Sequence, residues 1–145
     1  MFKTDGGGIA LSNPDVKISL GEGTWGTRLS QIGRSDKPIT ICTYSLPSLE
    51  YMKNILGKRT GSITLIAHRK FARQARQLRA TFPWLKVILK PDVHSKYVLI
   101  EPDTVWISSA NFGSSGWMEG TVGIHSKEAY QYMLKKTEEY IKERK

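Results

Sequence analysis

Apolar and polar positions along the chain follow two periods, one typical of strands and one typical of helices. Residues 16–20 alternate apolar and polar side chains, a pattern that predicts a half-buried strand. Short apolar segments predict further strands over residues 39–44, 62–67, 84–89, 93–100, 104–109 and 121–125. Helical spacing predicts a helix that opens at 45–47 and runs to residue 56, and two more over 69–81 and 127–144. A short helix is also predicted around 25–32.

The order of these elements predicts the fold class. Strands and helices alternate in the first part of the chain, and a run of strands followed by one helix completes it. This order favours an α/β fold with a mixed, mostly covered β-sheet flanked by helices. Gly6-Gly7-Gly8 and Asn13-Pro14 predict a flexible N-terminal lead-in over residues 1–14. Because no later segment is long enough to separate two domains, residues 15–145 are predicted to form one domain.

The chain carries a large excess of basic residues. Of its 145 residues, 22 are Lys or Arg and 13 are Asp or Glu, which gives a formal net charge of +9. Such a charge on a small domain favours a polyanionic partner, with nucleic acid first and an anionic membrane surface second. No apolar segment is long enough for a transmembrane helix, and the N-terminus has no secretory signal. The sequence therefore predicts a soluble, cytoplasmic protein with no membrane partner, and it would suit a phage or a mobile element.

Cysteine and histidine are too sparse for a disulfide scaffold or a zinc site. Cys42 is the one cysteine, so it cannot form an internal disulfide. The three histidines, His68, His94 and His125, lie far apart in the sequence and do not have the spacing of metal ligands. No glycine-rich phosphate loop and no Gly-x-Ser-x-Gly elbow is present either. We therefore expect neither a metal nor another cofactor.

Candidate catalytic residues are concentrated between residues 94 and 119. His94 and Lys96 are two positions apart in a predicted strand, so their side chains should project to the same face. The hairpin that follows should bring Ser109 and Asn111 back beside them. A nucleophile, a cation and an amide donor then converge on one surface. This set suits a phosphodiester, because imidazole can attack phosphorus while Lys and Asn stabilise charge on the phosphate oxygens.

At this point the sequence resembles the phospholipase D superfamily, whose signature is H-x-K-x4-D-x6-G-S-x-N. His94, Lys96, Ser109 and Asn111 match it at the correct spacing. The likeness extends over residues 15–126. It includes segment 39–45, which ends in Tyr-Ser, and segment 112–119, which ends in an acidic residue. This sequence departs from the signature at two positions. Glu101 stands in place of Asp, and Ser108 stands in place of Gly.

The resemblance implies a mechanism and an assembly. Members of the superfamily usually place two such motifs around one site, and this chain has one, so it looks like the small single-motif nucleases that act as homodimers. By carry-over, His94 of one subunit forms a phosphohistidine, and His94 of the other protonates the leaving oxygen and then activates water. Lys96 and Asn111 would hold the phosphate oxygens, and Ser109 could donate a hydroxyl. Glu119 is the candidate that accepts the second ring N–H of His94.

Basic residues outside the motif are candidates for contacts with nucleic acid. Arg69, Arg73, Arg76 and Arg79 form a stripe on the predicted helix over 69–81, and Lys90 lies on the strand that leads to His94. Each has a plainer interpretation as a solvated surface residue. If they do contact the backbone, binding should depend strongly on salt.

The function that these patterns favour is that of a metal-independent phosphodiesterase, an endonuclease that cleaves DNA or RNA at a site shared by two subunits. Two alternatives remain open. One is a catalytically silent nucleic-acid-binding or regulatory member of the family, suggested by Glu101 and Ser108. The other is a phospholipid phosphodiesterase.

Overall fold

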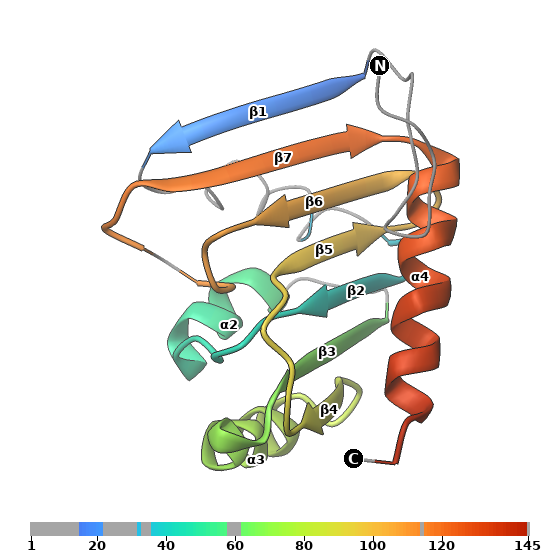
Figure 1. Ribbon diagram of the computed structural model, residues 1–145. Coiled ribbons are helices and arrows are strands. Elements are labelled where there is room, and N and C mark those ends of the chain that lie inside the picture. The colour runs from blue at the N-terminus through green and yellow to red at the C-terminus, as the bar shows by residue number, and fades with distance from the viewer. Residues whose placement is uncertain (1–14, 22–31, 33–35, 58–61, 114, 145) are drawn as a thin grey trace.

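The computed structural model describes residues 15–21, 32, 36–57, 62–113 and 115–144. The predicted lead-in over 1–14 lies outside the described residues, as does the predicted helix around 25–32, apart from Ile32, which is buried. All the strands of the described chain belong to a single seven-stranded sheet, in the order β1-β7-β6-β5-β2-β3-β4 (Figure 1). This sheet confirms the α/β prediction.

The sheet is mixed, as predicted. The three strands β2 (Ile39–Cys42), β3 (Ile63–His68) and β4 (Lys86–Lys90) pair in parallel, because a helical crossover connects each to the next. The remaining strands pair antiparallel and are β1 (Val16–Gly21), β5 (Tyr97–Ile100), β6 (Thr104–Ser108) and β7 (Glu119–His125). Strand β5 lies beside β2, so the antiparallel half joins the parallel half at the centre of the sheet.

Helices cover both faces. Helices α2 (Leu49–Leu56) and α3 (Ala72–Thr81), the latter preceded by the short 3-10 helix η1 (Arg69–Phe71), lie over one face, and α4 (Lys127–Lys142) lies over the other (Figure 1). Alternating residues of β5 show this division. Val98 belongs to the core with α2 and α3, and Leu99 packs with Ala129 and Tyr130 of α4. The sheet is therefore the middle layer of the domain.

Serine side chains set where two of the helices begin. Ser48 accepts a hydrogen bond from Tyr51 N, so α2 begins later than the predicted opening at 45–47. Ser126 accepts from Ala129 N in the same way at the start of α4. Strand β5 also begins later than predicted, at residue 97 rather than 93. The ladder to β6 ends where Ser108 N donates to Lys96 O, which leaves residues 93–96 outside regular pairing.

The prediction for residues 16–20 was wrong in one respect. They form a strand, but it is an edge strand, and its apolar side chains are exposed, with exposed fractions of 46% for Val16, 72% for Ile18 and 71% for Leu20. The alternating pattern indicated one apolar face correctly. Among the described residues, however, no helix lies over the part of the sheet that β1 and β7 form (Figure 1). An apolar face needs a covering partner, and the sequence pattern alone does not show which element supplies it.

Gly123 lies so close to the Trp106 ring that a side chain at this position should lower the stability of the protein. Gly123 pairs with Trp106 across β6 and β7, and a Cβ added to it would lie 2.1 Å from a carbon of the buried indole ring. Because the ring is packed in the core, we expect Gly123→Ala to lower the free energy of unfolding by about 2 kcal/mol, as overpacking does. Gly116→Ala is the matched control, since nothing lies within 4 Å of its added Cβ. Equal urea denaturation midpoints for the two variants would contradict the prediction.

Candidate active site

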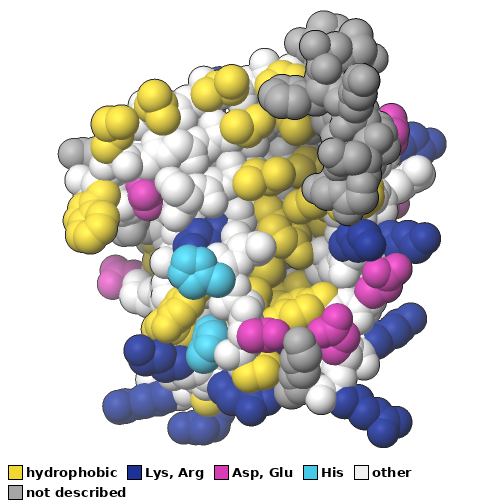
Figure 2. Space-filling model, in the orientation of Figure 1, with side chains coloured by type: hydrophobic (Ala, Val, Ile, Leu, Met, Phe, Trp, Pro, Cys, Tyr) yellow, Lys and Arg dark blue, Asp and Glu magenta, His cyan; other side chains and the backbone are white. Residues whose placement is uncertain are grey.

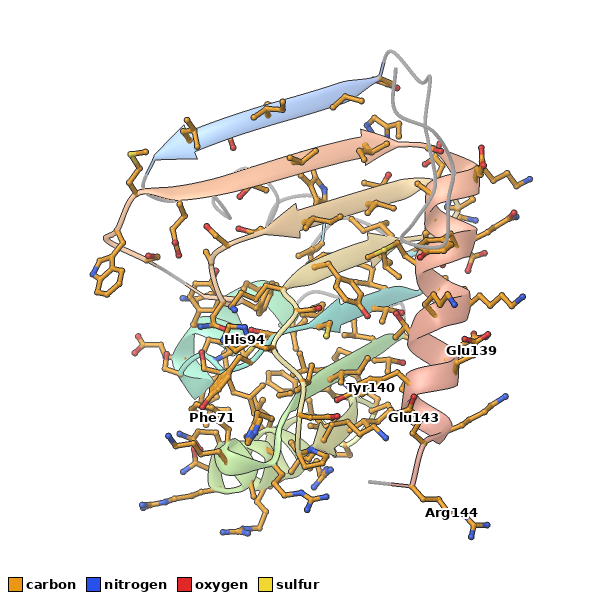
Figure 3. The ribbon with its side chains drawn as sticks, in the orientation of Figure 1. Phe71, His94, Glu139, Tyr140, Glu143 and Arg144 are labelled. Carbon is orange, nitrogen blue, oxygen red and sulfur yellow. The ribbon has the colours of Figure 1, made fainter. Side chains whose placement is uncertain are left out.

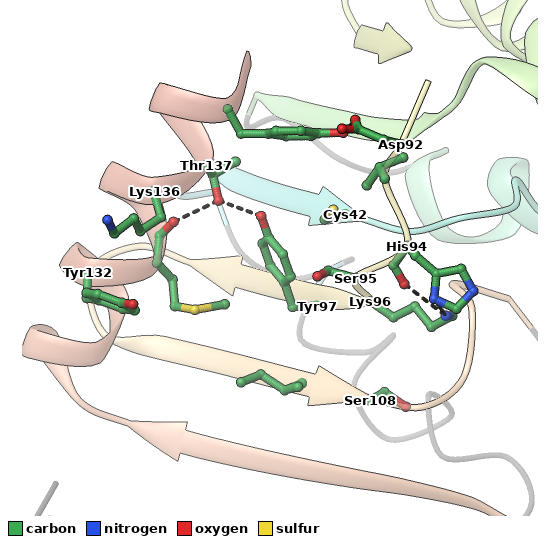
Figure 4. A pocket seen from close by; sticks show the side chains of 14 residues that line it. Cys42, Asp92, His94, Ser95, Lys96, Tyr97, Ser108, Tyr132, Lys136 and Thr137 are labelled. Atoms are coloured by element: carbon green, nitrogen blue, oxygen red, sulfur yellow. Dashed lines mark hydrogen bonds between the residues drawn. The ribbon is translucent and has the colours of Figure 1, made fainter. Parts of the chain in front are cut away.

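The candidate site lies at one end of the sheet, where β2 and β3 end and the chain approaches β5. Residues 93–96 form the segment that enters β5, and residues 109–112 follow β6 back to the same end. His94 projects from this segment beside the end of β2 (Figures 3 and 4). The antiparallel pairing of β5 with β6 thus brings together residues that are more than ten positions apart in the sequence.

His94 and Lys96 are in direct contact. Lys96 Nζ lies 3.3 Å from His94 Nδ1 and also donates to the His94 carbonyl oxygen at 2.9 Å (Figure 4). An ammonium group can only donate, so Nδ1 accepts in this arrangement. His94 is exposed and Lys96 is half-buried, so a ligand can reach both side chains. The shared face predicted for these two residues is therefore present.

Asn111 is held at the end of β2. Its Oδ1 accepts hydrogen bonds from Tyr44 N at 3.1 Å and from Ser45 N at 3.2 Å. These bonds identify which end of the side-chain amide is oxygen, and they orient its NH2 group as a donor. The Tyr44 ring is in edge contact with the His94 ring, with 5.4 Å between centroids. Asn111 and His94 therefore both contact Tyr44, a residue whose place at the site the sequence pattern did not indicate.

Glu119 has a different partner from the one expected. Its carboxylate accepts a hydrogen bond from Ser109 Oγ at 3.1 Å, and Ser109 Oγ in turn accepts from Gly120 N at 2.9 Å. The expected bond from the His94 ring to Glu119 is replaced by the contact between His94 and Lys96. The reason is local, because Glu119 begins β7 and Ser109 directly follows β6, its neighbour in the sheet. Glu119 and Ser109 form a pair beside the histidine rather than a support for it.

The two departures from the superfamily signature are accommodated. Ser108 is buried, and its Oγ accepts from Ala110 N at 3.0 Å and is bonded to Thr121 Oγ1 at 2.9 Å. Its hydroxyl thus stabilises the turn that carries Ser109 and Asn111. Glu101 is exposed and follows β5, at the opposite end of that strand from His94. Ser108 lines the same groove as His94, whereas Glu101 does not.

A groove extends from His94 between the sheet and α4. It has a volume of about 580 Å³ and passes between β5 and β6 on one side and α4 on the other (Figure 4). Its lining includes His94, Lys96, Tyr97, Ile107 and Met133. A hydrogen bond between the hydroxyl groups of Tyr97 and Thr137 links β5 to α4 on this face of the sheet, and Thr137 Oγ1 also donates to the Met133 carbonyl within α4.

Cys42 also lines this groove, which raises the question of a thiol nucleophile. Burial raises the pKa of Cys42 to about 11, although the hydrogen bond with Tyr97 and the charge of Lys96 act in the opposite direction. A thiol with this pKa is protonated near neutral pH and reacts slowly. We expect iodoacetamide to leave the native protein unmodified at pH 7 while it labels the urea-unfolded chain. Rapid labelling of the native thiol would contradict this prediction.

The predicted basic contacts divide into two groups. Arg69, Arg73 and Arg76 are exposed on η1 and α3, where Lys and Arg side chains gather at the lower edge of the molecule in Figure 2. Lys90 does not fit its expected role. It is buried, and its Nζ donates to the carbonyl oxygens of Glu143 at 2.7 Å and Ile141 at 3.4 Å. Lys90 therefore satisfies the carboxyl end of α4 and does not face a substrate.

The described residues contain neither a cluster of metal-ligating side chains nor a membrane-spanning helix. Within these ranges, no three side chains of His, Cys, Asp or Glu are grouped closely enough to hold a metal ion. Among the same residues, no helix is both long and apolar enough to cross a membrane.

The fold is that of known phospholipase D family structures. Nuc from Salmonella typhimurium, a member of that family, superposes with a TM-score of 0.68 and 17% identity over 86% of this chain and 93% of its own. Phosphatidylserine synthase from Haemophilus influenzae gives a TM-score of 0.71 and 14% identity over 93% of this chain and 38% of its own. TrmBL2, an archaeal chromatin protein that binds DNA, gives 0.65 and 10% over 90% of this chain and 53% of its own.

These likenesses show the fold alone. No protein-family model matches the sequence, and no curated protein matches it. The names of the three structures describe different functions, so the fold does not choose among them. The choice depends on the side chains at the end of the sheet.

Proposed function

We propose that this protein is a metal-independent phosphodiesterase that cleaves nucleic acid through a phosphohistidine. The observation that carries the proposal is the contact between His94 and Lys96 at an open end of the sheet, on a fold shared with phospholipase D family members. Imidazole is a competent nucleophile toward phosphorus, and the neighbouring cation stabilises the negative charge that develops on the phosphate oxygens.

The phosphate would be held by groups already in place. A bound phosphodiester competes for the Lys96 ammonium, which now donates to His94 Nδ1 and to the His94 carbonyl. Its transfer to a phosphate oxygen would free Nδ1, and either ring nitrogen could then carry the proton. The Asn111 amide donates to a second oxygen, because its own carbonyl is already satisfied by backbone N–H groups. Ser109 supplies a hydroxyl at the edge of this set, with Glu119 as its partner.

The reaction has two steps, and the second histidine would come from a second copy of the chain. His94 forms a bond to phosphorus as the bond to the leaving oxygen breaks, and that oxygen takes a proton from the partner's imidazole. Water then attacks the phosphohistidine, giving its proton to the same imidazole and restoring His94. The chain offers one His94 and one Lys96, so the complete site belongs to a homodimer.

The exposed apolar face supports a homodimer. Cross-strand pairing places Ile18, Val122 and Ile107 on the same face of the sheet, and Ile107 also lines the groove beside His94. Hydrophobic side chains in Figure 2 extend from β1 across this face toward the groove. A second copy that covers the face would remove the exposed apolar surface from water and would bring its own His94 toward the same groove.

The net charge favours nucleic acid over phospholipid as the substrate. A formal charge of +9 with exposed arginines on η1 and α3 suits a polyanion. Phosphatidylserine synthase, a lipid enzyme by name, shares the fold, so the lipid alternative keeps one specific observation in its favour. The silent alternative has another, because TrmBL2 is described as a DNA-binding chromatin protein.

A substrate panel tests the proposal. The wild-type protein is incubated in excess EDTA at low salt with single-stranded DNA, plasmid DNA, RNA and phospholipid vesicles. Cleavage of a nucleic acid in EDTA is the expected result. Binding of nucleic acid without any turnover would favour the silent alternative, and release of a lipid headgroup would favour the phospholipid enzyme.

A further inference from the structure

Three aromatic side chains outside the superfamily signature, here called the row, contact one another through Tyr44 beside His94. Tyr44 follows β2, His68 ends β3 and Phe71 ends η1. The Tyr44 ring is stacked on the His68 ring with 5.1 Å between centroids, and it makes edge contacts with Phe71 and His94, each with 5.4 Å between centroids. The row Tyr44–His68–Phe71 therefore connects the catalytic imidazole to the start of α3.

The row is accessible and rigid. All three residues are half-buried, so each keeps part of its surface exposed to solvent. His68 Nδ1 accepts a hydrogen bond from Lys70 N at 3.0 Å, which fixes the orientation of the imidazole. Phe71 packs against the hydrophobic core. Rings that are fixed in this way lose little conformational entropy when a ligand stacks on them.

Cations lie at the far end of the row. Arg69 and Lys70 follow His68 directly, Arg73 lies two residues after Phe71, and all three are exposed. Figure 3 places Phe71 between His94 and this basic end, and Figure 2 shows the Lys and Arg side chains gathered there. From the site outward, the order is thus imidazole, aromatic rings, then cations.

This order matches a nucleic-acid strand whose bases are unpaired. A strand with one phosphate at His94 presents a base to the adjacent rings and its next phosphates to the cations. A duplex cannot present its bases in this way, because they are paired and stacked inside the helix. Rings that stack on a base need no particular sequence, since every base has a π face.

We propose that the row Tyr44–His68–Phe71 is the base-stacking platform of a single-strand binding path that leads from His94 to Arg69 and Arg73. The inference deepens the proposed function, since it assumes that the phosphate bound at His94 belongs to nucleic acid. It makes the protein selective for single-stranded over double-stranded substrate.

Two substitutions remove a ring while preserving the local structure. His68→Asn keeps an acceptor for Lys70 N, because Asn caps helices well, and Phe71→Leu keeps apolar volume against the core. Trp84→Leu is the matched control. Trp84 is an exposed aromatic residue that precedes β4, and the parallel register of β3 with β4 places it at the opposite end of the sheet from His68.

The measurement is fluorescence anisotropy of dye-labelled oligothymidylate, oligouridylate and a blunt DNA hairpin, in a His94→Ala background that prevents cleavage. We expect tighter binding of the single strands than of the hairpin. His68→Asn and Phe71→Leu should each weaken single-strand binding about tenfold, the loss typical of one stacked base, and change hairpin binding little. Trp84→Leu should change neither. Thermal unfolding of each variant confirms that it is folded.

Unchanged single-strand affinities, an equal loss for the hairpin, or no binding of either single strand would overturn the inference. The two oligonucleotides also distinguish DNA from RNA as the ligand. Because binding is measured without turnover, the result is independent of the substrate panel. If the protein cleaves nucleic acid but the ring substitutions leave binding unchanged, the single-strand path is rejected and the phosphodiesterase proposal stands. If binding depends on the rings but no cleavage is found, the path stands and the phosphodiesterase proposal is rejected.

Discussion

His94→Ala is expected to lower the rate of phosphodiester cleavage by at least about a thousandfold, since loss of a nucleophile that forms a covalent intermediate removes the main reaction path. In the proposed homodimer the same substitution also removes the proton donor for the leaving oxygen. His94 is exposed and its ring contacts the side chains of Lys96 and Tyr44, so the ring carries little of the fold. The loss of activity should therefore come without a loss of stability.

His125→Ala is the matched control. His125 is a second exposed histidine, but it ends β7, at the opposite end of that strand from Glu119, and its Nδ1 contacts Thr104 Oγ1 at 3.2 Å. This variant should cleave as the wild type does. In a reaction with a labelled oligonucleotide, the label should become attached to the wild-type protein and not to His94→Ala. The reaction is quenched in alkaline detergent because phosphohistidine is acid-labile. Full activity of His94→Ala would reject the proposed nucleophile.

Ile18→Glu is expected to convert a homodimer to a monomer and to abolish cleavage together with it. Ile18 is 72% exposed on the edge strand, and it faces the same side of the sheet as Ile107 beside the groove. A carboxylate there would have to be desolvated in a dimer that covers this face, whereas it stays hydrated in the monomer. Sedimentation velocity measures the oligomeric state, and cleavage is assayed at the same protein concentration.

Trp84→Glu is the control for this prediction, because Trp84 is also an exposed apolar residue but precedes β4, at the other edge of the sheet. It should leave both assembly and activity unchanged. A site shared by two subunits also predicts the behaviour of mixed dimers. Excess His94→Ala protein, which exchanges into mixed dimers, should suppress wild-type cleavage. An active monomer of Ile18→Glu, or wild-type activity that ignores the inactive chain, would refute the shared site.

The helices and strands were predictable because each segment carries its own periodicity. The strands of the parallel half and the amphipathic helix α4 appear close to their predicted ranges, since local alternation and helical spacing reflect which face each element buries. The boundaries that differ depend on single contacts. Ser48 sets the start of α2, and the bond from Ser108 N to Lys96 O sets where pairing of β5 with β6 ends.

The site was predictable only in part. The spacing of His94 and Lys96 predicted a shared face through strand geometry. The two side chains do meet, although both residues lie before β5 begins. The partners of Glu119, the burial of Lys90 and the ring contacts of Tyr44 depend on elements that meet from distant parts of the chain. Lys90 is an example of what the sequence could not predict. A lysine on a strand that leads to the site is expected to contact the ligand, and only the structure shows that the end of α4 covers it.

The sequence by itself determined the element order, the α/β class, the basic charge and the candidate catalytic residues, because these follow from local periodicity and from side-chain type. Only the tertiary structure decided that Tyr44, His68 and Phe71 form one row beside His94, and that β1 lies at the edge with its apolar face exposed. The reason is that strand order is a long-range property. The carboxyl ends of the parallel strands β2 and β3 lie at the same end of the sheet, and no pattern within either segment specifies which strand it pairs with.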